Sequence, residues 1–62
     1  MEDKSPMKHS VETWWDATSR LWITQIKDAE GNQIGSASYA GSRASAKVNH
    51  SDCLDYAAGL DA

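Results

Sequence analysis

His50 and Cys53 are the residues of this 62-residue chain whose types and spacing suit nucleophilic chemistry. Three positions apart on a helix, they lie on one side, close enough for an imidazole to take the proton of a thiol. A catalytic cysteine also needs an oxyanion hole and a substrate cleft, which a small sheet with one helix seldom provides. We therefore interpret Cys53 as a small buried hydrophobic residue and His50 as a residue at the border of the core, and we expect no enzyme.

A metal site would need His9, His50 and Cys53 to converge with an acid. None of the paired-ligand spacings of zinc modules occurs in the sequence, so we expect neither a metal nor a cofactor. Because Cys53 is the single cysteine, an internal disulfide is excluded.

Large aromatic side chains form the second group that could do chemistry: Trp14, Trp15, Trp22 and Tyr39. Exposed aromatics on a sheet can stack nucleic-acid bases. However, six Lys and Arg are scattered against nine Asp and Glu, for a net charge of −3, whereas nucleic-acid binders cluster their cations. Nucleic acid is therefore disfavoured as a partner, and we expect the aromatic residues to serve the core or a protein interface. The alternative is a sheet-based nucleic-acid-binding protein that uses Arg20 and Lys27.

Three strands have to position these residues. β-Branched and aromatic residues over about 11–16 and 21–27, followed by a Gly-, Ser- and Ala-rich run over 33–40, predict a three-stranded antiparallel meander. A helix follows the strands, which makes the fold α+β. We expect residues 1–9 to form a flexible N-terminal tail and residues 10–62 to form a single small domain.

The C-terminal helix is predicted over about 43–58, with Ser42 as its N-cap. Apolar residues at spacings of three and four favour one continuous helix. In contrast, Ser51 followed by two acidic residues resembles a new N-cap, which favours a break near 49–51. The sequence leaves both alternatives open.

The loop Asp28–Asn32 predicts a hairpin in which Gly31 takes the left-handed conformation and Asp28 faces Asn32. The register then follows by regular continuation of the ladder. It pairs Ile26 with Ile34, Thr24 with Ser36, Trp22 with Ser38, Ile23 with Ala37, and Leu21 with Tyr39.

Apolar side chains lie on both faces of the predicted sheet. One face carries Trp22, Ile26 and Ile34, and the other carries Leu21, Ile23, Ala37 and Tyr39. The consecutive Trp14 and Trp15 point to opposite faces. One helix covers one face only, so the other leaves an aromatic patch larger than monomers usually expose. The predicted interaction residues are Trp14, Trp15, Trp22, Ile26 and Ile34.

The segment from about 22 to 48 contains a hairpin, a tyrosine and a capped helix start, in that order. The residues that carry this pattern are Trp22, Ile26, Gly31-Asn32, Ile34, Tyr39, Ser42, Arg43 and Ala46. In this respect the segment resembles the small YegP-like ββα modules. The resemblance implies modules that pair through their sheets or helices, and it implies no known chemistry. Small proteins of this type are frequent among phage and mobile-element accessory genes.

No apolar run is long enough to span a membrane or to serve as a secretory signal, so we expect a cytoplasmic protein without a membrane partner. The leading hypothesis is a small non-enzymatic protein-interaction module. Its apolar, Trp-bearing sheet face would join two copies in a homodimer or bind a cellular protein.

Overall fold

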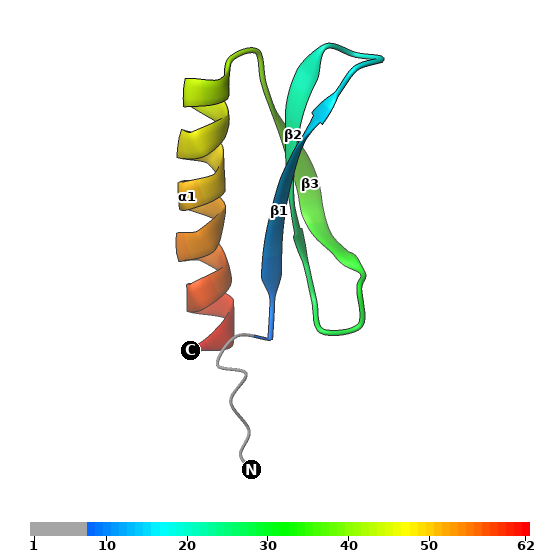
Figure 1. Cartoon of the computed structure of the whole chain (residues 1–62). Helices are drawn as coiled ribbons and strands as arrows, with labels where there is room; N and C mark the ends of the chain where they lie inside the picture. The colour runs from blue at the N-terminus through cyan, green and yellow to red at the C-terminus, as the bar shows by residue number, and fades with distance from the viewer. Residues whose placement is uncertain (1–7) are drawn as a thin grey trace.

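A computed structural model describes residues 8–62 and shows an α+β fold (Figure 1). The strands β1 (Ser10–Asp16), β2 (Leu21–Lys27) and β3 (Gln33–Ala40) form an antiparallel sheet in the order β1-β2-β3, and α1 (Arg43–Asp61) follows. The helix lies against one face of the sheet and contacts all three strands. The predicted meander and helix are thus confirmed, with β1 starting one residue earlier than expected.

The β2–β3 hairpin begins as the sequence predicts. The Asp28 N–H donates to the carbonyl of Asn32 at 2.9 Å, and Gly31 has φ +89°. The Asp28 carboxylate also accepts from the N–H groups of Glu30 and Asn32, both at 2.9 Å. These bonds hold the turn, and Ile26 pairs with Ile34 as expected.

Beyond that pair the predicted register is wrong by two residues. Thr24 pairs with Ser38, Ile23 with Tyr39 and Trp22 with Ala40, because β3 has an irregularity opposite the stretch from Thr24 to Ile26. Gly35, at φ +70°, lies in this bulge and supplies a conformation that residues with a Cβ rarely adopt. Since the shift is two residues, every β3 side chain beyond the bulge keeps its predicted face.

The helix α1 is continuous from Arg43 to Asp61, so the alternative with a break near 49–51 is wrong. Ser42 caps it as predicted, because its side chain accepts from the N–H of Ser45 at 3.1 Å. The helix also extends three residues beyond the predicted end, through Gly59. Its packing against the sheet outweighs the weak helix propensity of the residues near position 50.

The core between α1 and the sheet is small. Its buried apolar residues are Ile26, Ala40, Ala46 and Ala57, and Thr24 is buried with them at 1% exposure. Ile26 is therefore the only large aliphatic side chain in the buried core among residues 8–62. A core of this size stabilises a 62-residue chain only weakly.

The end of α1 is tied to the start of β1. The Asp61 carboxylate accepts from the N–H groups of Lys8 (2.8 Å) and His9 (3.2 Å), and it also contacts Nδ1 of His9. Of the predicted tail, residues 1–7 lie outside the described residues, while Lys8 and His9 are held by these bonds.

Candidate functional site

Four of the five predicted interaction residues lie on the side of the sheet that α1 covers: Trp15, Trp22, Ile26 and Ile34. Ile26 is 7% exposed, and Trp22 and Ile34, which share its face, are half-buried. These side chains therefore face the chain's own helix, and their role in an interface stays a prediction. Sequence periodicity separates the two faces of a sheet but does not show which face the helix will cover.

Trp15 shares the helix-facing side with Trp22, its cross-strand partner. The two indoles form an edge-to-face pair with ring centroids 5.5 Å apart and an interplanar angle of 61°. Such aromatic pairs stabilise a fold beyond the area that they bury. Trp15 remains 46% exposed at the end of the sheet.

The side of the sheet that faces away from α1 carries a row of large apolar side chains. Trp14 pairs with Ile23 across β1 and β2, and Ile23 pairs with Tyr39 across β2 and β3. Trp14 is 39% exposed and Tyr39 is 61% exposed. No element among residues 8–62 lies over this row (Figure 1). We call Trp14, Ile23 and Tyr39 the open-face row.

Of the five predicted interaction residues, only Trp14 belongs to the open-face row. The alternation of side chains along the strands predicts that Ile23 and Tyr39 share one face of the sheet, as the structure shows. The predicted interaction residues do not include them. The signal that would have selected them is their alignment across three strands, which the two-residue bulge creates.

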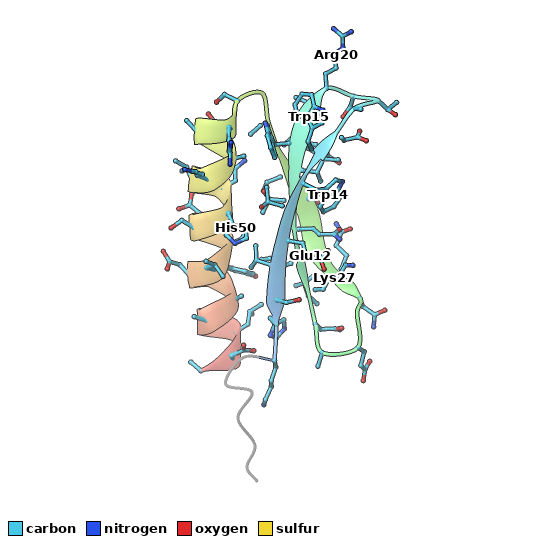
Figure 2. All side chains as sticks on the ribbon, in the orientation of Figure 1. Glu12, Trp14, Trp15, Arg20, Lys27 and His50 are labelled. Atoms are coloured by element: carbon cyan, nitrogen blue, oxygen red, sulfur yellow. The ribbon has the colours of Figure 1, made fainter. Side chains whose placement is uncertain are left out.

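Charged side chains border the open-face row. Lys27 Nζ lies 3.4 Å from Glu12 Oε1, and both side chains point away from α1 together with Trp14 (Figure 2). Asp16 follows on the same face of β1. Hydrogen bonds from the Ser19 hydroxyl and N–H hold the pKa of Asp16 below its ordinary value. The face therefore carries both signs of charge, and its lysine is already paired with a carboxylate.

The suggested pair of His50 and Cys53 is not assembled as a catalytic dyad. His50 points from α1 toward the sheet, where its Nδ1 lies 2.8 Å from Oγ1 of Thr13 (Figure 2). Thr13 Oγ1 in turn lies 2.9 Å from Oγ1 of the buried Thr24. This chain of hydrogen bonds satisfies the polar atoms between helix and sheet.

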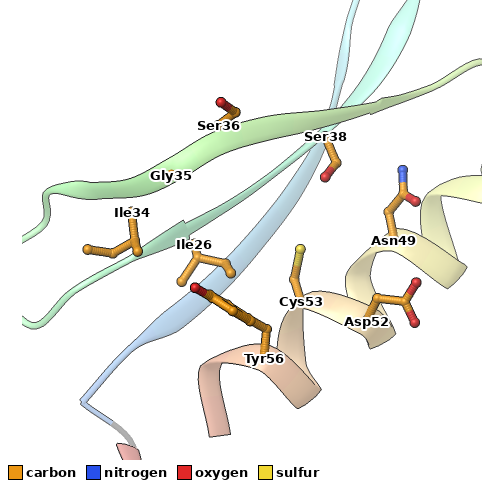
Figure 3. A pocket seen from close by; sticks show the side chains of 9 residues that line it. All are labelled: Ile26, Ile34, Gly35, Ser36, Ser38, Asn49, Asp52, Cys53 and Tyr56. Atoms are coloured by element: carbon orange, nitrogen blue, oxygen red, sulfur yellow. The ribbon is translucent and has the colours of Figure 1, made fainter. Parts of the chain in front are cut away.

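Cys53 faces a different part of the molecule. It lines a groove of about 330 Å³ between α1 and β3, with Ile26 and Ile34 on the strand side and Asp52 and Tyr56 on the helix side (Figure 3). The thiol is half-buried and free. None of the other groove residues is a histidine or lysine that could activate the thiol.

Within residues 8–62, no three His, Cys, Asp or Glu side chains cluster as metal ligands. His9, one of the three residues considered for a metal site, instead contacts Asp61. In the same part of the chain, no helix has the length and apolar character needed to cross a bilayer.

No family model, curated protein or solved structure matches this chain. The resemblance to YegP-like modules therefore stays a prediction.

Proposed function

We propose that this chain is a small non-enzymatic interaction module that pairs with a second copy of itself through the open-face row. The observation that carries the proposal is the contrast between the two sides of the sheet. The covered side buries one large aliphatic residue, Ile26, whereas the uncovered side presents Trp14 and Tyr39 at 39% and 61% exposure. Trp and Tyr are the residues most enriched at the centres of protein interfaces.

A second copy suits this face better than a foreign protein does. The small core indicates that the fold gains from an added apolar layer, and oligomerisation is a usual way for small domains to gain one. A partner that stabilises the fold has to be present where the chain folds, and a second copy of the chain meets this condition. In a two-fold arrangement, Glu12 of one copy can approach Lys27 of the other, so the face is compatible with itself in charge.

The size of the face sets the strength of the dimer. Three strands of about seven residues present a surface of roughly 340 Å², from a strand spacing of about 4.8 Å and a rise of about 3.4 Å per residue. A stable interface buries about 800 Å² on each partner. We therefore expect a weak, reversible homodimer, and we place it in the cytoplasm, where the free thiol of Cys53 is compatible with the reducing conditions.

Sedimentation equilibrium over a range of chain concentrations tests the proposal. Trp14→Thr removes the single indole of the open-face row and keeps a residue that favours strands, so it should weaken dimerisation by about tenfold or more. Trp15→Thr is the matched control, because it removes the neighbouring indole from the opposite face and should leave the dimer constant nearly unchanged.

Two results would overturn the dimer. One is a native chain that sediments as a monomer up to millimolar concentration, which would assign the open-face row to a foreign partner. The other is an equal loss of association in both Trp variants.

The alternative function is a nucleic-acid interface that uses Arg20 and Lys27. It predicts binding of single strands that weakens steeply with salt. The pairing of Lys27 with Glu12 argues against it.

A further inference from the structure

A second cavity lies between the beginning of α1 and the β1–β2 pair, on the side of the sheet opposite the open-face row. Its volume is about 230 Å³. The residues that line it are Thr13, Trp22, Arg43, Ala46, Lys47 and His50. We call it the Trp22 cavity. It combines an apolar wall, from Trp22 and Ala46, with three nitrogen-bearing side chains from one helix.

The polar groups of the Trp22 cavity are mainly hydrogen-bond donors. Arg43 and Lys47 are exposed cations that cannot accept a hydrogen bond, and within residues 8–62 no carboxylate forms an ion pair with either. Nδ1 of His50 is engaged with Thr13. A ligand that satisfies these groups has to bring acceptors and negative charge.

The position of Arg43 strengthens this argument. It is the first residue of α1, and the first turn contains no acidic residue. A cation at the positive end of a helix dipole reduces helix stability, whereas it adds to the field that attracts an anion. Arg43 is therefore unfavourable for the helix and favourable for anion binding.

We propose that the Trp22 cavity binds a small aromatic phosphate, that is, one planar ring carrying a phosphate monoester. A phosphate monoester has a charge of about −1.5 to −2 near neutral pH, which matches the two cations. An apolar cavity of about 150 Å³ holds a benzene ring, so the open cavity of about 230 Å³ has room for one ring with its phosphate, whereas a nucleotide would extend beyond it into solvent. The ring would contact the Trp22 indole, and the phosphate would face Arg43 and Lys47.

The overall charge of the chain excludes a general attraction of anions as the cause of binding. With a net charge of −3, the molecule does not attract anions in general. Binding of a phosphate ester at moderate salt therefore requires a local site. The inference does not rest on the proposed dimer, because the open-face row lies on the other side of the sheet.

Amide chemical shifts of the full chain, followed during titration with phenyl phosphate, test the site. We expect saturable shifts at Thr13, Trp22 and the first two turns of α1. Inorganic phosphate and phenol each carry half of the ligand, so each should bind more weakly than phenyl phosphate. Adenosine monophosphate, whose ribose and base would extend beyond the cavity into solvent, should also bind more weakly.

Arg43→Gln combined with Lys47→Gln should weaken phenyl phosphate binding by about tenfold, as expected for two partly exposed charge contacts. Lys27→Gln makes the same type of change on the opposite face and should have no effect. Arg43→Glu should abolish binding while leaving the melting temperature equal or higher, which separates loss of the site from loss of the fold.

Three outcomes would overturn the proposal. Phenyl phosphate could shift amides no more than phenol does, or adenosine monophosphate could bind more tightly. Alternatively, Lys27→Gln could weaken binding as much as the double variant does.

Discussion

Asp61 joins the two ends of the described chain through a single carboxylate. Its burial raises the pKa, but the hydrogen bonds from the His9 side chain and from the N–H groups of His9 and Lys8 outweigh that effect, so the pKa lies below its ordinary value of 3.8. Asp61 is also an acid at the negative end of a helix, which is unfavourable in itself. The hydrogen bonds from Lys8 and His9 offset this cost.

The lowered pKa of Asp61 predicts loss of stability in acid. In the unfolded chain the carboxyl binds its proton at a higher pH than in the folded chain, so the contribution of Asp61 is complete above about pH 4 and disappears as the pH falls through the folded pKa. Asp61→Asn should therefore lower the free energy of unfolding at pH 7 and flatten its decline as the pH falls below about 4. Urea titrations at several pH values measure both effects, and an unchanged slope in the variant would contradict the assignment.

Thr13 is the central member of the hydrogen-bonded chain that connects Thr24 to His50. Thr13→Val would leave the buried hydroxyl of Thr24 and Nδ1 of His50 without this partner, and it should cost about 1–3 kcal/mol of unfolding free energy. Thr24→Val keeps the bond between Thr13 and His50, so it should cost less. Chemical denaturation of the two variants compares them, and a larger loss in Thr24→Val would show that Thr13 is not the central member.

At the scale of elements, the strands and the helix follow from local patterns, but the register of β3 does not. The Asp28–Asn32 turn and the pair of Ile26 with Ile34 could be predicted because turn chemistry is local. The bulge could not, because Gly35 is one of several small residues in β3 and no side-chain pattern marks it. The face that α1 leaves uncovered could not be predicted for a related reason: both faces are apolar, so periodicity alone does not show which one α1 covers.

The bulge provides a test at this scale. Gly35 has φ +70°, and no atom lies within 4 Å of where its Cβ would be, so substitution there is limited by backbone conformation alone. Gly35→Ala should cost about 1–2 kcal/mol of unfolding free energy, and Gly35→Asn should cost less because asparagine tolerates the left-handed region. Thermal unfolding of both variants measures the difference. Equal losses would show that the conformation at position 35 is not what limits stability.

For the molecule as a whole, the exposed aromatic surface and the small core have one cause: the fold buries only a small part of its apolar surface. Among residues 8–62, Ile26 is the one large aliphatic residue in the buried core, and several large apolar residues, such as Trp14, Trp15 and Tyr39, are exposed. A domain built in this way gains stability when a partner covers the surface, so its folding should be linked to association.

That linkage predicts a melting temperature that depends on concentration. At a chain concentration about 100 times the dimer dissociation constant, pairing adds roughly 3 kcal/mol, which corresponds to an increase of roughly 10 °C or more for a chain of this size. Trp14→Thr should remove most of the dependence on concentration. Scanning calorimetry at low and high concentration gives the shift, and a constant melting temperature in the native chain would contradict the linkage.

The two outer strands of the sheet differ, and this limits how copies can add side by side. The free edge of β1 is regular, whereas β3 is interrupted by its bulge. Continuous growth by strand addition would require every copy to pair through both edges, the edge of β3 included. A contact between two β1 edges leaves only β3 edges free, so we expect the bulge in β3 to disfavour further addition of copies.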